Sequence, residues 1–206
     1  IEIQPLNDYP ELDIALSELS KFDWAIFAST NAVDVVFQRL ELAGMDARAF
    51  GTVKLGAIGP ATAGALRRRG LNPDFVPESF VSEAVVSGLK DLGMAGMKVL
   101  LPHGDIARDT LTNGLTNLGA VVSRALAYRT VTPDDSENLA KEILAEGVDV
   151  ATFSSSSTVT NLCKLIGNVD KLSKLTIACI GPITAATARE MGLKVDIVSE
   201  EHTIPG

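Results

Sequence analysis

The sequence predicts an α/β protein made of two related three-layer α/β/α domains, each with a parallel sheet. Three observations support this fold class: short apolar segments alternate with helical ones, the apolar segments are continuously apolar, and one series of motifs occurs twice. Continuously apolar strands are typical of parallel sheets, because helices cover both faces of such sheets. Alternation of strands with helices also places consecutive strands parallel to one another.

The internal repeat contains two motif pairs in the same order. Residues 22–33 (FDWAIFASTNAV) resemble residues 148–159 (VDVATFSSSSTV), and residues 54–78 (KLGAIGPATAGALRRRGLNPDFVPE) resemble residues 176–200 (TIACIGPITAATAREMGLKVDIVSE). Repeats of this length do not form a solenoid, which stacks three or more short units. We therefore expect two related domains, which would present equivalent loops to a shared ligand.

Apolar runs of strand length alternate with stretches of helical periodicity along the whole chain. Strands are expected at Trp24–Ala28, Lys54–Ile58, Asp74–Val76, Lys98–Leu101, Val150–Phe153, Thr176–Ile180 and Val195–Val198. Helices are expected at Val33–Ala43, Thr62–Arg69, Ser82–Leu92, Ala107–Leu118, Glu137–Ala145, Val159–Ile166 and Ala185–Met191. Glycines at positions 70 and 192 end two of these helices at equivalent places in the repeat.

Two extended segments, Ile1–Asn7 and Ser123–Pro133, interrupt this pattern, and each is suited to be an interdomain strand. The strand-loop-helix element Lys98–Gly119 has no counterpart after Thr132. We therefore predict that the chain leaves one domain, completes the other and returns. The predicted boundaries are a complete domain at 6–124, linker strands at 1–5 and 125–131, and a returning domain at 132–206. The returning domain is expected to be incomplete, with its first strand and helix preceding residue 1.

Composition excludes several classes of partner. The net charge of −8 argues against nucleic acid, because phosphate binding requires a basic surface. No apolar run approaches the roughly 18 residues of a membrane span, so no membrane partner is expected. The two cysteines, Cys163 and Cys179, and the two histidines have no metal-ligand spacing. We expect buried thiols in a reducing compartment, the cytoplasm, and neither a metal nor a cofactor.

The candidate site lies in the loops that follow the strands, because open parallel sheets bind ligands beyond the carboxyl ends of their strands. Hydroxyls and backbone N–H groups at helix starts bind anions there. The candidate substrate-binding residues are Ser29, Thr30, Asn31, Gly59, Pro60, Thr62, His103, Gly104, Ser154, Ser155, Ser156, Gly181, Pro182 and Thr184. Helix capping alone would explain one such loop. Matching loops in both copies favour a shared anionic ligand.

The sequence contains none of the common catalytic motifs: no P-loop, GxGxxG, GxSxG or HExxH. No pair of carboxylates is marked by its position either. An enzyme with this sequence would therefore act mainly by holding its substrate in one shape.

The ordered motifs resemble those of the uroporphyrinogen-III synthase family. They are FASTNAV and IGPxTA after strands, LPHGD after Val99–Leu100, and AYRT in the second extended segment, and the resemblance spans residues 1–206. It implies two α/β domains with five-stranded parallel sheets, joined by a two-stranded ladder, the first domain being discontinuous. It also implies a cofactor-independent hydro-lyase that cyclises hydroxymethylbilane, a linear tetrapyrrole, to uroporphyrinogen III with loss of water and inversion of ring D.

The same resemblance implies a role for Tyr128, because the family has a tyrosine here that is proposed to help the hydroxyl group leave. It further implies a monomer that takes its substrate from the upstream bilane synthase. Because the substrate is a polycarboxylate and the chain is acidic, binding must depend on local donors, among which Arg108 and Arg129 are candidates. The alternative is a non-catalytic bilobal module that binds, or responds to, an anionic small molecule.

Overall fold

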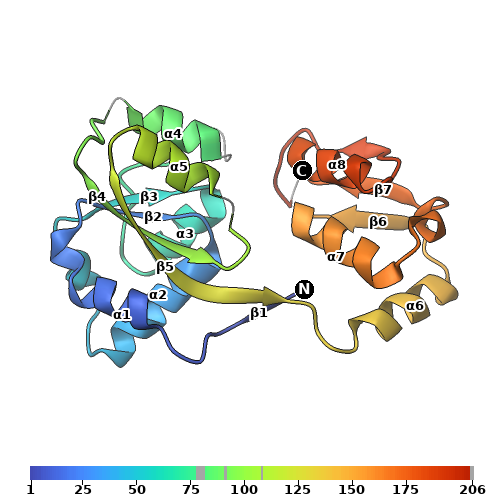
Figure 1. Cartoon of the computed structure of the whole chain (residues 1–206), viewed down its shortest axis with the longest axis horizontal. Coiled ribbons are helices and arrows are strands. Elements are labelled where there is room, and N and C mark those ends of the chain that lie inside the picture. Colours follow the sequence, from blue (N-terminus) through green and yellow to red (C-terminus); the bar gives the residue numbers. More distant parts are fainter. Residues whose placement is uncertain (78–81, 91, 108, 205–206) are drawn as a thin grey trace. The chain divides into compact units, whose positions relative to one another are not determined.

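The structure is a computed structural model that describes residues 1–77, 82–90, 92–107 and 109–204 (Figure 1). The chain divides into two compact units. The larger unit is Ile3–Thr130, and the smaller unit combines Ile1–Glu2 with Val131–Gly206. The chain therefore passes between the units twice. Both units contain parallel strands and helices, which confirms the predicted α/β class.

A five-stranded sheet with the order β1-β5-β4-β2-β3 forms the centre of the larger unit. Its strands are β1 (Glu2–Gln4), β2 (Trp24–Phe27), β3 (Lys54–Ala57), β4 (Lys98–Gly104) and β5 (Val121–Val131). Strand β2 pairs in parallel with both β3 and β4, and β4 pairs in parallel with β5. The strand expected at residues 74–76 is reduced to a single bridge between Phe75 and Gly56.

Helices cover both faces of this sheet. They are α1 (Pro10–Ser17), α2 (Thr30–Leu42), α3 (Pro60–Arg68), α4 (Ser82–Lys90) and α5 (Thr110–Asn117). Successive residues of β2 alternate between the faces: Ala25 and Phe27 join a core with α1, α2 and α3, whereas Trp24 and Ile26 join a core with α4 and α5. Figure 1 shows α4 and α5 on one side of the strands and α1 and α2 on the other.

The smaller unit has a three-stranded parallel sheet with the order β6-β7-β8. Its strands are β6 (Val150–Phe153), β7 (Thr176–Cys179) and β8 (Ile197–Val198), and its helices are α6 (Ser136–Glu146), α7 (Ser156–Ile166) and α8 (Pro182–Glu190). The core contains residues from β6, β7, α7 and α8, among them both cysteines. Burial raises the pKa of the Cys163 and Cys179 thiols, so they remain protonated apolar side chains.

The sequence repeat corresponds to repeated hydrogen bonds. In the larger unit, the Asp74 carboxylate accepts a hydrogen bond from the backbone N–H of Leu55, with an N···O distance of 2.7 Å. In the smaller unit, Asp196 accepts the equivalent bond from Ile177 at 3.0 Å. Each carboxylate thus attaches the segment that follows a helix to the strand that precedes the same helix. Matching sequence positions therefore make matching contacts.

Asp196 gives a pH-dependent contribution to stability. The N–H of Ile177 first, and then Lys194, with its Nζ atom 3.1 Å from the carboxylate, lower the pKa of Asp196. A lowered folded-state pKa stabilises the fold above the ordinary carboxyl value of about 3.9, and this stabilisation is lost as the pH falls through the lowered value. We expect the free energy of unfolding to fall less in Asp196→Asn than in the parent between pH 6 and pH 2.5. Denaturant titrations at both pH values measure this, and parallel decreases would contradict it.

Candidate functional site

A pocket of about 260 Å³ lies at the carboxyl ends of β2, β4 and β5 in the larger unit. Four of the residues expected to form the site line it, namely Ser29, His103, Gly104 and Tyr128. Its other lining residues are Ala28, Leu101, Pro102, Ala107, Leu111, Thr112 and Arg124. The pocket therefore brings together residues that are far apart in the sequence, at the edge where parallel sheets bind ligands.

Ser29 connects a helix N-terminus to Tyr128. Its Oγ atom accepts a hydrogen bond from the backbone N–H of Ala32 at 3.1 Å, so Ser29 caps α2. The same Oγ atom lies 3.1 Å from the Tyr128 hydroxyl oxygen. The arrangement that leaves the phenol proton available to a ligand has Ser29 donating its own proton to the phenol oxygen. The serine hydroxyl thus fixes the position of the phenol.

An irregularity between β4 and β5 sets the direction of the Tyr128 side chain. His103 pairs with Leu126, but Gly104 pairs with Tyr128, so β5 contains one extra residue at this point. Such a bulge changes the face on which the following side chains lie. A Cβ atom on Gly104 would lie 2.5 Å from Tyr128 Cε2 and 2.7 Å from its Cζ. Only glycine therefore allows the ring to occupy this place.

Asp105 holds the end of β5 after the bulge. The backbone N–H of Asp105 donates a hydrogen bond to the carbonyl oxygen of Tyr128 at 3.1 Å. The Asp105 carboxylate accepts a second bond from the backbone N–H of Thr130 at 2.9 Å. The backbone on both sides of Arg129 is thereby attached to the loop after β4.

Arg124 also lines this pocket, although its position in the sequence did not mark it as a site residue. Its guanidinium forms an ion pair with Asp109, and its Nη2 atom lies 3.5 Å from His103 Nδ1. His103 Nδ1 also lies 2.7 Å from the carbonyl oxygen of Gly104. Of the two arginines considered from sequence, Arg129 lines a different pocket, beside α1 and the segment before it, and residue 108 lies outside the described residues.

The other expected residues of the larger unit lie at two helix starts. Thr30 and Asn31 are half-buried in the first turn of α2. Gly59 precedes α3 with a φ angle of 91°, which favours glycine. Pro60 is exposed and occupies the first position of the helix. Thr62 follows in that helix and is only 4% exposed. Its side chain is therefore packed inside the unit and not exposed at the surface of the loop.

The smaller unit contains the equivalent hydroxyl-rich loop. Ser154 is exposed after β6, Ser155 caps α7, and a reciprocal bond with Thr158 completes a capping box. The Ser156 Oγ atom accepts a hydrogen bond from the Thr187 hydroxyl at 2.8 Å, which joins α7 to α8. A pocket of about 510 Å³ opens at the carboxyl ends of β6 and β7, where Ser154 is one of its lining residues.

The Gly-Pro loop of the smaller unit follows β7. Gly181 precedes α8 in an extended conformation, with the His202 ring close to it, and Pro182 is exposed at the first helical position. Thr184 is only 5% exposed in the first turn of α8. Both buried threonines, 62 and 184, thus occupy matching places beneath helix N-termini.

Thr184→Ala tests whether this buried threonine supports a binding loop. We expect KM to rise several-fold, because the loop loses its support, and the free energy of unfolding to fall by about 1 kcal/mol with the lost methyl group. Thr184→Ser is the matched control, since it loses the methyl group and keeps the hydroxyl. An alanine variant that melts lower but has the parent's KM would remove Thr184 from the binding residues.

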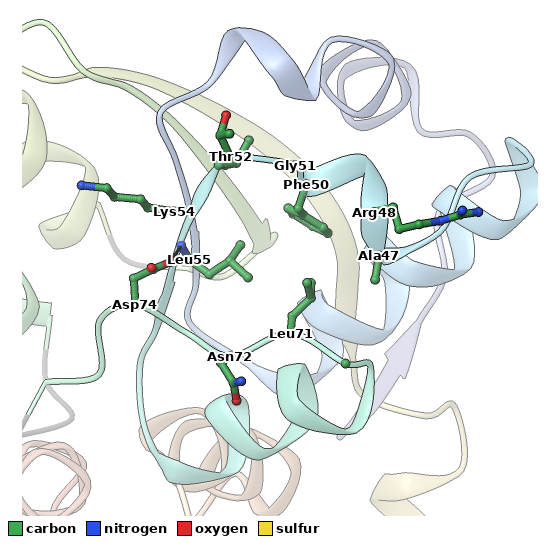
Figure 2. A pocket seen from close by; sticks show the side chains of 12 residues that line it. Ala47, Arg48, Phe50, Gly51, Thr52, Lys54, Leu55, Leu71, Asn72 and Asp74 are labelled. Atoms are coloured by element: carbon green, nitrogen blue, oxygen red, sulfur yellow. Dashed lines mark hydrogen bonds between the residues drawn. The ribbon is translucent and has the colours of Figure 1, made fainter.

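A further pocket, of about 770 Å³, lies at the opposite edge of the larger sheet, before β3 (Figure 2). Its charged residues are engaged in local contacts: Arg48 pairs with Asp46, Asp74 accepts the N–H of Leu55, and Lys54 lies over the Trp24 ring. This edge carries the amino ends of the strands, so the pocket is not the candidate site.

No group of three or more histidine, cysteine or carboxylate side chains is placed to hold a metal ion within the described part of the chain. In the same residues, no helix has both the length and the apolar character needed to cross a membrane.

Comparison with known proteins identifies the family. The family model described as uroporphyrinogen-III synthase HemD matches residues 1–206. The chain belongs to the uroporphyrinogen-III synthase family. It is 32% identical to the uroporphyrinogen-III synthase of Synechococcus elongatus, and the match covers all of this chain and 80% of that protein. It is 36% identical to a putative uroporphyrinogen-III synthase of Methanothermobacter thermautotrophicus, over 89% of this chain and 75% of that protein. The resemblance expected from the sequence is thereby confirmed.

Solved structures of the same family have the same fold. A mutant uroporphyrinogen III synthase from Thermus thermophilus matches 97% of this chain and 80% of its own, with a TM-score of 0.70 and 20% identity. The uroporphyrinogen-III synthetase of Helicobacter pylori matches 99% of this chain and 85% of its own, with a TM-score of 0.63 and 17% identity. Members of this family are cofactor-independent enzymes of the lyase class.

Proposed function

We propose that this chain is a uroporphyrinogen-III synthase that cyclises hydroxymethylbilane to uroporphyrinogen III with loss of water. Membership of the family over residues 1–206 carries this proposal. The geometry adds a phenol, that of Tyr128, held against a serine hydroxyl in a pocket at the ligand-binding edge of a parallel sheet.

The first step is departure of hydroxide from the hydroxymethyl group of ring A, which leaves an azafulvenium-like cation. Tyr128 assists by donating its phenol proton, or a hydrogen bond, to the departing oxygen. Ser29 stabilises the charge that develops on the phenol oxygen by donating a hydrogen bond to it from the serine hydroxyl. The two oxygens are 3.1 Å apart. The departing hydroxide and the transferred proton leave together as water.

Ring closure turns the cation into a neutral product and therefore releases one proton, which returns to the Tyr128 phenolate and restores the phenol. The substituted carbon of ring D attacks the cation and gives a spiro intermediate, whose fragmentation and recombination invert ring D. The uncatalysed reaction closes the ring without inversion, so the enzyme must hold the chain of pyrroles in one shape. No electrons are transferred in the overall dehydration, so the reaction requires no redox cofactor.

The loop residues supply donors for the carboxylates of the substrate. Helices α2, α3, α7 and α8 all begin directly after a parallel strand, and each presents backbone N–H groups at its N-terminus. The residues assigned to this role are Ser29, Thr30, Asn31, Gly59, Pro60, Thr62, His103, Gly104, Ser154, Ser155, Ser156, Gly181, Pro182 and Thr184. Local donors of this kind can bind a polycarboxylate although the net charge is −8.

We further infer that the two units are related α/β/α domains. The repeated carboxylate-to-strand bonds of Asp74 and Asp196 support this relation. The position of β1 next to β5 supports a two-stranded ladder formed by the linker strands at 1–5 and 125–131. In this proposal, 6–124 forms the complete domain and 132–206 belongs to the discontinuous one. The enzyme would act as a cytoplasmic monomer that takes its substrate from the bilane synthase.

Product analysis tests the proposed function. Purified protein is incubated with hydroxymethylbilane, and the type III and type I uroporphyrinogens are oxidised and separated by chromatography. We expect type III to predominate. Formation of type I alone, at the rate of a protein-free control, would contradict the proposal. Substrate binding without turnover would then favour the alternative, a non-catalytic module that binds an anionic small molecule.

A further inference from the structure

The pocket beside Tyr128 contains a cationic side chain that the reaction steps above do not use. Arg124 lies on β5 and lines the pocket together with Ser29 and Tyr128. Its side chain is 32% exposed, so the guanidinium is partly withdrawn from solvent and still reachable by a ligand. A cation in this position, close to the proposed proton donor, is suited to hold an anionic part of the same ligand.

We propose that Arg124 anchors one carboxylate arm of a pyrrole ring of the substrate in this pocket. This inference rests on the proposed function, because that function supplies the polycarboxylate ligand. It assigns to Arg124 a binding role, in which the guanidinium fixes the ring whose neighbouring atoms reach Tyr128.

The ion pair with Asp109 leaves most of the hydrogen-bonding capacity of the Arg124 guanidinium unused. Asp109 is 66% exposed, and ion pairs with exposed partners contribute little to stability. Asp109 precedes α5 but does not cap it through its side chain. The recorded bond to Asp109 joins Nη1 to a single carboxylate oxygen, whereas a guanidinium presents five N–H donors in a fork that matches a whole carboxylate. A ligand carboxylate can therefore bind the same group.

The surroundings of the guanidinium favour an anion. Apolar side chains form much of the wall, including Leu101, Pro102 and Leu111. An apolar wall lowers the local dielectric constant and strengthens the attraction between opposite charges. Thr112 also lines the pocket, and its buried hydroxyl has no hydrogen-bond partner among the described residues.

The size of the pocket limits what it can hold. At about 260 Å³ it is smaller than the roughly 300–1,000 Å³ of sites that enclose a whole drug-sized ligand. A tetrapyrrole is larger still. The pocket therefore accommodates one carboxylate-bearing end of the substrate, with the remainder outside it.

Arg124→Gln tests the anchor by kinetics. We expect KM for hydroxymethylbilane to rise about 10- to 100-fold, as for the loss of a charge-assisted hydrogen bond, with kcat nearly unchanged. Arg39→Gln is the matched control, because Arg39 is also ion-paired, with Asp13, and is 25% exposed in the same unit. Arg39 lines none of the pockets described here, so the KM of Arg39→Gln should equal the parent value. A lowered kcat with the parent's KM in Arg124→Gln would overturn the anchoring role.

A binding measurement separates this inference from the proposed function. The probe is a single pyrrole that carries one acetate and one propionate arm, titrated into the parent chain and followed by NMR. Arg124→Gln should weaken its binding by a similar factor, and the dimethyl ester of the probe should not bind. Equal binding by parent and variant, or no binding to the parent, would overturn the anchor even if the chain makes uroporphyrinogen III. Arginine-dependent binding in a chain that makes none would leave the anchor standing and overturn the proposed function alone.

Discussion

Tyr128→Phe is expected to lower kcat by roughly tenfold to a thousandfold, the range for loss of a general acid that water partly replaces. The substitution keeps the ring that packs beside Gly104 and removes only the hydroxyl that lies 3.1 Å from Ser29 Oγ. The lost hydrogen bond should lower the free energy of unfolding by no more than about 1 kcal/mol. Turnover should therefore change far more than folding does.

Tyr9 supplies a matched control for this experiment, since the chain contains only these two tyrosines. Its hydroxyl accepts a hydrogen bond from the backbone N–H of Leu6 at 3.0 Å, and its ring lies in the core of the larger unit. Tyr9→Phe loses a comparable bond and should keep the parent's kcat. The measurements are kcat, the ratio of type III to type I product, and thermal unfolding. A Tyr128→Phe variant with the parent's kcat and product ratio would remove the phenol from the mechanism.

Gly104→Ala is expected to have an effect at least as large, because it displaces the whole Tyr128 ring. The added Cβ would lie 2.5 Å from Cε2, which is closer than real Cβ contacts allow, and 3.0 Å from the hydroxyl oxygen. Overpacking of this kind costs about 1–3 kcal/mol of stability. We expect kcat to fall by tenfold or more and the unfolding temperature to drop.

The double variant shows whether Gly104 acts through Tyr128. If it does, Gly104→Ala combined with Tyr128→Phe should have nearly the kcat of Gly104→Ala alone, because residues in contact are not additive. Multiplied losses would show that the two positions act independently. Gly64→Ala is the control for an added methyl group, since its Cβ would meet only Arg68 Nη1 at 3.5 Å within α3. That variant should keep the parent's kcat and gain up to about 1 kcal/mol of stability.

Local sequence signals predicted most of the elements of the fold, and their errors have physical causes. The helix expected from Val33 begins at Thr30, and the one expected from Val159 begins at Ser156. Apolar periodicity marks only the buried part of a helix, whereas Ser29 and Ser155 start these helices one turn earlier by capping them. Helix α1 was not predicted, although Pro10 occupies its first position and Leu12 and Leu16 are buried one turn apart.

The candidate site could be predicted from the sequence less completely than the fold. Pocket residues at strand ends, such as Ser29 and Gly104, could be predicted, because the carboxyl ends of parallel strands identify a functional edge without knowledge of packing. Arg124 could not, because its place beside His103 depends on the register of β4 against β5 and on the packing of α5 against both strands. Its sequence context, one of two arginines in the segment that forms β5, was the available signal.

The Asp105 bonds described above have a mechanical consequence. The larger unit ends at Thr130, and Tyr128 lies only two residues before that end. Asp105 holds the backbone at Tyr128 and again at Thr130, so the last residues of β5 are fixed to the loop that follows Gly104. A torsional change at Val131 would have to break the second of these bonds before it reached the phenol. The Tyr128 phenol is therefore held by contacts within the larger unit, on the near side of the connection that follows it.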